Sequence, residues 1–269
     1  MATVDRFGLR GAEMTDEQLA LALGAVVFVA GAVGLVLQHL LHEKFTTGGS
    51  RDMIGAVVGL LTLLSALTMG LLIWTAYGVY AGQNAAIQNL AAKVLQLDLA
   101  LSDYGPDAAP ARKDLRDIVG KTIDDIWGAK ATDADFAATN FAAAVRNLRD
   151  REKRLANLHP STDAQTQALA VANSTVDAIG QARIQMSFAL ASPVSYPLLL
   201  IVVGWGVFLF CGFGLMSKGH AMSLVAVIVG AIAVASAVYM ILDLSSPYSG
   251  IFRASSAPLE QVLAVMGKE

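Results

Sequence analysis

The sequence predicts an all-α membrane protein with four transmembrane helices, arranged as two hairpins, and a helical bundle inserted between spans 2 and 3. One observation is composition: the 269 residues are 55% hydrophobic, with a mean hydropathy of +0.55, which is too apolar for one soluble domain. The other is charge spacing, because Asp, Glu, Lys and Arg are absent from residues 18–42, 53–92, 184–217 and 219–242. A helix of about 20 apolar residues crosses about 30 Å of hydrocarbon, so each stretch can hold one span.

The four spans can be placed within these stretches. They are expected at about residues 19–37, 54–77, 197–215 and 221–242. Short connections separate the first two spans and the last two, so each pair is predicted to form a helical hairpin. The chain then divides into an N-terminal tail with the first span and a short loop (1–53), the second span (54–80), an extramembrane four-helix domain (81–193), the third and fourth spans (194–244) and a C-terminal interfacial segment (245–269).

Charges near the span ends predict the orientation. Four crossings put both termini and the middle domain on one side of the membrane and the two short loops on the other. The short loops carry Lys44, Arg51 and Lys218, whereas Glu17 and Asp243 are the charges nearest the membrane on the opposite side. Since cytoplasmic short loops collect Lys and Arg, we expect an extracytoplasmic middle domain in a multi-pass membrane protein.

The second span is predicted to continue out of the membrane as one long helix. Beyond Tyr77, apolar residues keep a helical spacing; they are Ile87, Leu90, Val94, Leu97 and Leu101. The run Tyr104-Gly105-Pro106 then ends the helix.

Three further helices complete the predicted extramembrane domain. One ends at Gly128, and the next is capped by Asp133 and extends to Leu155. Thr162, with Gln165 three residues later, has the form of a capping box that opens the last helix. Four amphipathic helices with short connections predict an antiparallel bundle.

No set of residues typical of an enzyme occurs in the sequence. It has no nucleophile elbow, zincin His pair, phosphate-binding loop or kinase signature, so we expect no catalytic residue and no cofactor. A net charge of -3 without a basic face argues against nucleic acid as a partner. His39 and His42 could hold a metal or relay a proton, or they could be polar anchors at the interface; no metal site is predicted from this pair alone.

The second span differs from the others in its hydroxyl groups. Thr62, Ser65, Thr68 and Thr75 follow one another at intervals of three, three and seven residues, which predicts that they lie along one helix face. Such a strip could line an aqueous path at the centre of an oligomer, where hydroxyls make weak, reversible contacts with ions. Thr and Ser in spans also commonly bond their own backbone or a neighbouring helix, so both interpretations stay open.

The segment after the fourth span carries the most specific pattern in the chain. It reads Asp243-Leu244-Ser245-Ser246-Pro247-Tyr248-Ser249-Gly250. This segment resembles the Asp-Leu-Asp-Arg-Pro-Phe-Ser-Gly sequence of the bestrophin-like family, a family of bacterial and plant membrane proteins of unknown function. The resemblance implies the bacterial inner (plasma) membrane as the location. Tyr248 replaces the Phe, and Ser245 and Ser246 replace the Asp-Arg pair. Further matches to the family are Arg253, Pro258-Leu259, Tyr80 and Trp127.

Four residues of this motif are predicted to be structural: Asp243, Pro247, Tyr248 and Gly250. They are expected to turn the chain at the membrane surface after the fourth span. Pro fixes its own backbone torsion, Gly permits one that other residues avoid, and a Tyr ring suits the membrane interface.

The hydroxyl pattern and the resemblance together predict a homo-oligomeric ion channel or small-ion transporter, surrounded by the lipid bilayer, whose second span lines the path. True bestrophins are pentameric anion channels, but their neck sequence and acidic calcium-binding cluster are not visible in this chain. The alternative is a membrane-anchored sensor or scaffold whose extramembrane bundle binds a ligand or a partner protein.

Overall fold

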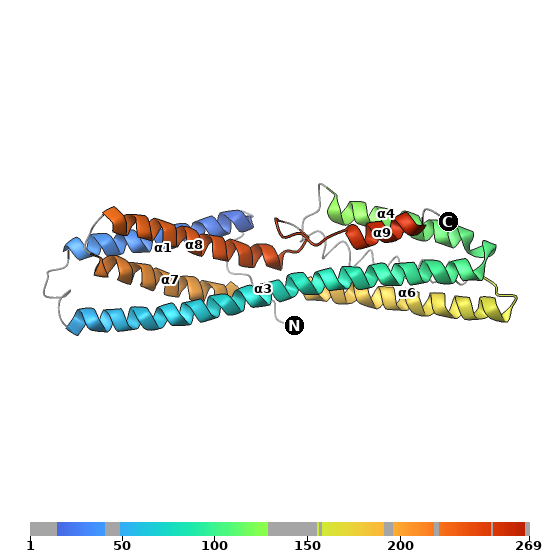
Figure 1. Cartoon of the computed structure of the whole chain (residues 1–269), viewed down its shortest axis with the longest axis horizontal. Helices are drawn as coiled ribbons and strands as arrows, with labels where there is room; N and C mark the ends of the chain where they lie inside the picture. The colour runs from blue at the N-terminus through green and yellow to red at the C-terminus, as the bar shows by residue number, and fades with distance from the viewer. Residues whose placement is uncertain are drawn as a thin grey trace, which may run out of the picture. The chain divides into compact units, whose positions relative to one another are not determined.

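A computed structural model of the chain, shown in Figure 1, describes residues 15–40, 49–128, 155, 158–190, 196–217, 221–248 and 250–266. Its helices are α1 (Asp16–Leu40), α3 (Gly49–Tyr104), η1 (Pro106–Ala108), α4 (Ala109–Trp127), α6 (Asp163–Leu190), α7 (Tyr196–Met216), α8 (Ala221–Ser245) and α9 (Ala257–Met266). No strand occurs in these ranges, which confirms the all-helical prediction for them.

Four of the helices are long and apolar enough to cross a membrane. They are α1, α3, α7 and α8, and the four predicted spans fall within them. The expected number of apolar helices is therefore confirmed for the part of the chain that the structure describes.

The chain folds as two compact units. The first, called the apolar unit below, consists of Met1–Ala76 and Val194–Leu242. The second, called the polar unit, consists of Tyr77–Pro193 and Asp243–Glu269. The amino-terminal half of α3 belongs to the apolar unit and the carboxyl-terminal half to the polar unit.

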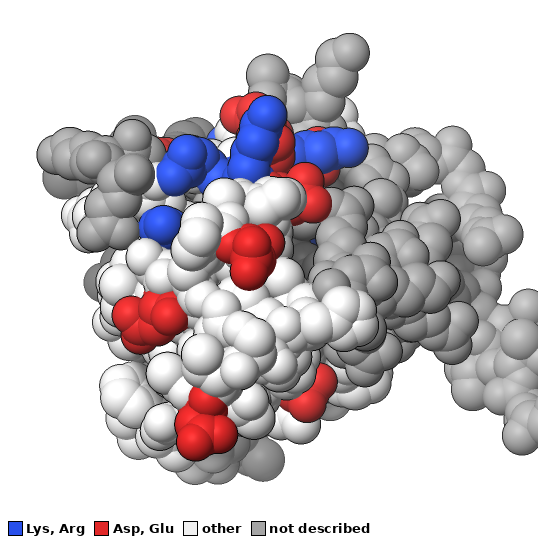
Figure 2. All heavy atoms as spheres, turned by 90° about the vertical axis from the view of Figure 1, so that its right-hand side faces the viewer, with Lys and Arg blue, Asp and Glu red and all other residues white. Residues whose placement is uncertain are grey.

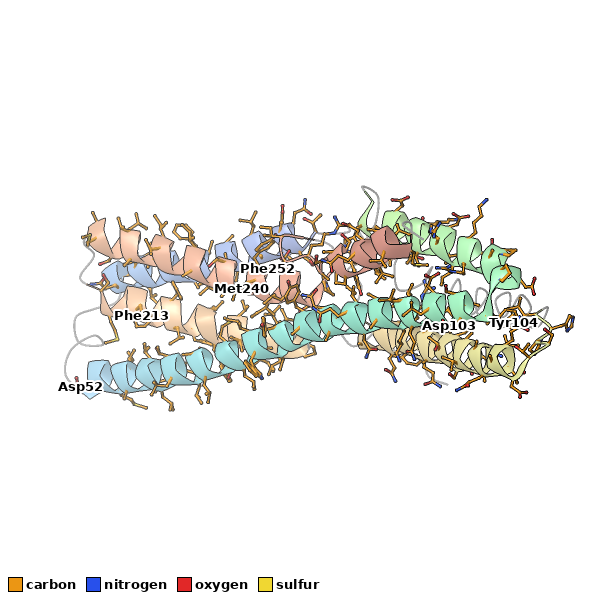
Figure 3. The ribbon with its side chains drawn as sticks, turned by 45° about the vertical axis from the view of Figure 1, so that its right-hand side comes forward. Asp52, Asp103, Tyr104, Phe213, Met240 and Phe252 are labelled. Carbon is orange, nitrogen blue, oxygen red and sulfur yellow. The ribbon has the colours of Figure 1, made fainter. Side chains whose placement is uncertain are left out.

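In the apolar unit, α1 packs along α7 so closely that two glycines leave no room for a side chain (Figure 1). A Cβ on Gly34 would collide with the carbonyl oxygen of Cys211, and one on Gly214 would collide with the backbone of Gly31. Small residues at helix contacts are typical of packing in lipid. Large apolar side chains instead face outward, such as Phe213, which is labelled in Figure 3 and is 48% exposed.

Helix α3 runs without interruption over 56 residues, which confirms that the second span continues as one long helix. The predicted apolar stripe from Ile87 to Leu101 is buried in the polar unit. Asp103 and Tyr104 are the last residues of the helix (Figure 3). Gly105 follows with a φ of 106°, a torsion that residues with a Cβ avoid, and this ends the helix as expected.

The polar unit encloses a continuous apolar core. Helices α3, α4, α6 and α9 all contribute to it, for example through Leu97, Val119, Ile179 and Leu259. Figure 2 shows one face of this unit, on which Lys and Arg gather along the upper edge with some Asp and Glu among them, and further Asp and Glu lie lower down. Its exterior therefore carries charge of both signs, as in a soluble protein.

The predicted helix ends of the polar unit are found with small shifts. Helix α4 is followed by Gly128, as expected. Before α6, the Gln165 amide donates to Oγ1 of Thr162 at 3.2 Å, while the Gln165 carboxamide oxygen accepts from the amide of Ser161 at 2.9 Å. The capping box is thus present, but its second hydrogen bond, to the Gln165 side chain, comes from the amide of Ser161 instead of that of Thr162. The predicted helix at 133–155 lies outside the described residues, except for Leu155, which is buried.

Candidate functional site

The four hydroxyl residues of the second span lie in the amino-terminal half of α3 but differ in environment. Thr62 donates its hydroxyl hydrogen to the carbonyl oxygen four residues earlier, and Thr75 donates to the one three residues earlier, each at 2.8 Å. The Ser65 oxygen is buried with no partner among the described residues, and Thr68 is half-buried. Two of the four hydroxyls thus bond their own backbone, as the alternative interpretation expects, and a pore-lining role stays a prediction.

These hydroxyls form a broad band rather than a narrow strip. At 3.6 residues per turn, Thr62 and Thr75 point about 140° apart around the helix. Ser65 lies between them in the sequence. It is seven residues, or about two helical turns, from both Val58 and Leu72, so the three side chains share one face. Val58 and Leu72 are 7% and 2% exposed, which makes this face the buried one. The band therefore straddles the face of α3 that is packed within the apolar unit.

The best-defined polar site is the turn after α8, where the Asp243 carboxylate binds two backbone amides. Ile251 donates to Oδ1 at 3.0 Å, and Phe252, labelled in Figure 3, donates to Oδ2 at 2.8 Å. Gly250 has a φ of 81°, and a Cβ there would collide with the same carboxylate. Only glycine satisfies both conditions, so Asp243 and Gly250 define one turn together.

Tyr248 joins this turn to two long helices. Its side chain is 1% exposed, and its hydroxyl donates to Oε1 of Gln83 on α3 at 2.9 Å. Nε2 of Gln83 in turn donates to the carbonyl oxygen of Met186 on α6 at 3.2 Å. The Tyr248 ring, for which the sequence suggested an interfacial position, is instead enclosed in the core of the polar unit because Gln83 satisfies its hydroxyl there.

Trp127 and Arg253 join the same turn to α4. Nε1 of Trp127 donates to the carbonyl oxygen of Ala254 at 2.7 Å, and its ring meets that of Tyr248 edge-on, with centroids 6.1 Å apart. Arg253 donates from Nε to the carbonyl oxygen of Tyr248 at 2.9 Å and from a terminal nitrogen to that of Ile126 at 3.3 Å. The two side chains therefore hold the C-terminal segment against the end of α4.

The chemistry of this turn is that of a structural joint. Its buried polar side chains form hydrogen bonds with backbone groups or with one another. Pro247 is also fully buried. This geometry accords with the structural role expected of Asp243, Pro247, Tyr248 and Gly250, which still awaits a test. Among the described residues, no group of three or more His, Cys, Asp or Glu could hold a metal ion, and the side chains of His39 and His42 lie outside them.

Gln83 and Asn84 belong to this joint but were not identified from the sequence. Oδ1 of Asn84 accepts the amide of Ser255 at 3.3 Å, so both carboxamides contact the C-terminal segment. One signal was present: after Asp52 they are the first carboxamide side chains in a long apolar helix. A buried carboxamide requires hydrogen-bond partners, which makes such a pair a candidate contact site.

A second polar contact crosses the core of the polar unit. Nε and a terminal nitrogen of Arg112 on α4 bind the two oxygens of Asp98 on α3, both at 2.9 Å. The Asp98 side chain is 3% exposed and that of Arg112 is 19% exposed. This bidentate pair fixes α4 on α3 through charge-assisted hydrogen bonds.

Comparisons with known proteins agree with the motif. The Bestrophin-like domain model matches residues 23–259. Two crystal structures of mutants of a bacterial bestrophin homologue from Klebsiella pneumoniae are similar in fold, each with 15% sequence identity and a TM-score of 0.61. The first covers 95% of this chain and 100% of that one, and the second covers 93% and 97%. No curated protein matches the sequence. Since the matched residues include both the apolar helices and the turn after α8, the chain belongs to the Bestrophin-like family.

Proposed function

We propose that this protein is a homo-oligomeric ion channel or small-ion transporter in which the amino-terminal half of α3 lines the path. Membership of the Bestrophin-like family and the fold shared with a bacterial bestrophin homologue support this proposal by analogy. The structural feature that carries it is the free surface of α3. Of the residues in the most apolar stretch of α3, 11% are buried, whereas 39% are buried in the corresponding stretch of α7.

A helix with so little of its surface covered within one chain has room for contacts with other copies. Leu63 and Leu67 are 71% and 75% exposed, which suits lipid or a neighbouring subunit. The hydroxyl band adds polar groups to this otherwise apolar helix. In an oligomer, the part of the band outside the packed face, which includes the exposed Thr62 and Thr75 and the half-buried Thr68, would line the path and replace part of the hydration shell of an ion.

The hydrogen bonds of the band favour a cation. Thr62 and Thr75 donate their only hydroxyl hydrogen to the backbone. Each oxygen then keeps only lone pairs for an outside partner, and lone pairs coordinate cations rather than anions. We therefore include small cations as the first ions to test.

The proposal places the chain as two hairpins around the inserted helical bundle, with both termini and that bundle outside the cytoplasm of a bacterial cell. Reporter fusions at Gly105 and Lys218 should then report opposite compartments, with Lys218 inside. Fusions that report the same compartment would refute this topology.

Thiol modification tests the path directly. The native Cys211 is first replaced by Ala, and Thr68→Cys is compared with Leu63→Cys, which lies on another face of α3. A water-soluble thiol reagent should modify the cysteine at 68 and change the current through reconstituted protein. The cysteine at 63 should react more slowly because it faces lipid. An inert cysteine at 68, together with bilayers that show no current above background, would refute conduction through this path.

The alternative function, a sensor or scaffold, has one structural observation in its favour. A groove of about 270 Å³ lies between α3 and α6 in the polar unit, lined in part by Gly82, Gln83 and Gln185. Such a mixture of small and carboxamide side chains could accept a small polar ligand. Protein that conducts no ion but whose melting temperature rises with such a ligand would favour this function.

A further inference from the structure

Two apolar side chains lie exposed in the turn after α8. Ile251 is 74% exposed, and Phe252, labelled in Figure 3, is 42% exposed. Neither belongs to the apolar core of the polar unit. Their backbone amides are the two that donate to the Asp243 carboxylate, at 3.0 and 2.8 Å. Hydrogen bonds thus fix the backbone of this pair, while its side chains remain outside the core.

The end of α8 sets the level of this pair relative to a bilayer. Residues 219–242 contain no Asp, Glu, Lys or Arg, and Asp243, in the last turn of the helix, is the first charge after them. In a membrane-spanning α8, such a first charge marks where the helix leaves the hydrocarbon. Because both amides lie within 3.0 Å of this carboxylate, Ile251 and Phe252 would lie at the membrane surface.

Further exposed apolar side chains lie at the same level of the polar unit. Tyr248 of the joint donates to Gln83, and Gln83 donates to the carbonyl oxygen of Met186. Tyr77, 50% exposed, precedes Gln83 by less than two helical turns, and Phe188, 61% exposed, follows Met186 within one turn. Four of the seven large apolar side chains exposed on this unit, among its described residues, are therefore near the joint; the other three are Leu99, Val171 and Val265. Such a gathering is expected where a protein meets the boundary between lipid and water.

The chemistry of the pair fits lipid better than a charged or a protein partner. The neighbouring cation, Arg253, donates to the carbonyl oxygens of Tyr248 and Ile126, so its charge is held against the protein. The contact that remains is apolar and does not require anionic headgroups. A stable contact with another protein buries about 800 Å² on each side, far more than two side chains offer.

We propose that Ile251 and Phe252 insert their side chains among the lipids at the membrane surface and anchor the joint after α8 there. The proposal requires that α8 spans the membrane, but it does not depend on ion conduction. The anchor would hold Tyr248 at a constant depth and, through the bond of Tyr248 to Gln83, also the adjoining part of α3. The interfacial position that the sequence suggested for Tyr248 then belongs to its two neighbours.

Fluorescence quenching in the full-length protein tests this contact. Cys211 is replaced by Ala, Ile251→Cys is labelled with an environment-sensitive fluorophore, and the protein is placed in vesicles of phosphatidylcholine. A nitroxide attached near the headgroup end of the acyl chain should at least halve the emission, because an apolar side chain at the surface reaches that depth. Iodide in the water should quench this label only weakly. Vesicles that also contain phosphatidylglycerol should give the same result, since the contact is apolar.

Leu99→Cys is the matched control, because Leu99 is also a large apolar residue of the polar unit and is 50% exposed. It follows Gln83 by 16 residues, or about 24 Å along α3, so its label should respond to iodide and not to the nitroxide lipid. A label at 251 that iodide quenches as strongly as the label at 99 would place the turn in water. A label at 251 that neither quencher reaches would show that a second copy or another protein covers it. Either result, or a contact that appears only with phosphatidylglycerol, overturns the proposal.

A photoreactive lipid gives the answer without any substitution, should the cysteine variants fail to fold. A diazirine on the acyl chain near the headgroup is activated in vesicles that contain the wild-type protein, and adducts are mapped by mass spectrometry. Adducts on Ile251 or Phe252 support the anchor. Adducts on α8, for example at Ile232, which is 63% exposed, without any on the turn would refute it.

Discussion

In the apolar unit, large apolar side chains such as Leu67 and Met222 are 75% and 77% exposed, whereas in the polar unit Ile87 and Ile179 are 1% and 2% exposed. One face of the polar unit carries charged side chains of both signs (Figure 2), and the polar side chains that are buried among the described residues, such as Gln83, Asp98 and Asp243, also belong to this unit. Lipid is the natural solvent of the first arrangement and water of the second.

The two units also use hydrogen bonds differently. In the apolar unit, the hydroxyls of Thr62 and Thr75 bond within their own helix. In the polar unit, side chains bond across elements that are distant in sequence, as Tyr248 does with Gln83 over 165 residues. Close backbone approach therefore positions helices in the apolar unit, whereas directional bonds add specificity in the polar unit. Four substitutions test this difference, from the largest expected effect to the smallest.

Gly250→Ala should have the largest effect, because it attacks the most constrained turn of the polar unit. The left-handed torsion costs an alanine about 1–2 kcal/mol, and displacement of Asp243 weakens two charge-assisted bonds, so we expect a loss of about 3 kcal/mol or more. Thermal unfolding of the purified protein measures it. Gly120→Ala, in the interior of α4 where a Cβ meets only Leu263 at 4.0 Å, is the control and should be neutral or stabilising. Equal stability of the two variants would contradict the assigned turn.

Asp98→Asn should destabilise the polar unit by about 2 kcal/mol, since the Arg112 guanidinium loses its counter-charge but keeps part of its hydration. Because Asp98 is buried, the loss should persist at high salt. Asp103→Asn removes the same charge from an exposed position at the end of α3 and should change little. A loss that vanishes in high salt would show that the pair is open to solvent.

Trp127→Phe should cost about 1–2 kcal/mol. The change keeps an aromatic ring against Tyr248 but leaves the buried carbonyl oxygen of Ala254, a residue that is 2% exposed, without its donor. Denaturant unfolding gives the difference. Trp74→Phe in the apolar unit, where the side chain is 71% exposed, should be close to neutral. If the two variants lose the same stability, directional bonds do not distinguish the units.

Thr62→Val should have the smallest effect on stability, below about 0.5 kcal/mol. The hydroxyl that it removes bonds a carbonyl oxygen that already accepts the regular helical bond, and valine suits lipid. Melting of the variant in detergent checks this. The same variant sharpens the functional comparison, since a changed current at unchanged stability would assign Thr62 to the ion path.

Much of the helical organisation could be predicted because its causes are local. The absence of charge marks the four apolar helices, and the apolar spacing from Ile87 to Leu101 identifies the long extension of α3. Gly105 and Pro106 end that helix through their own backbone torsions. Such features depend on residues within a few positions of one another, so they can be predicted from the sequence alone.

The polar site could be predicted only in part. The motif after α8 was identified through its resemblance to a family, and the importance of Gly250 follows from its residue type. Its partners could not be foreseen: Gln83 meets Tyr248 across 165 residues and Met186 across 103. Nor could the sequence reveal that Thr62 and Thr75 turn their hydroxyl hydrogens to the backbone, because a rotamer depends on its surroundings.

The division between the two kinds of information has a physical reason. Apolar length, helix period and chain breakers act through the local backbone, so the order of residues is enough to state which segments are helices and which suit a membrane. The pairing of Asp98 with Arg112, the bond of Tyr248 to Gln83 and the two amides on Asp243 arise when segments from different parts of the chain pack together. Burial then decides which polar groups must find partners, and burial exists only in the folded chain.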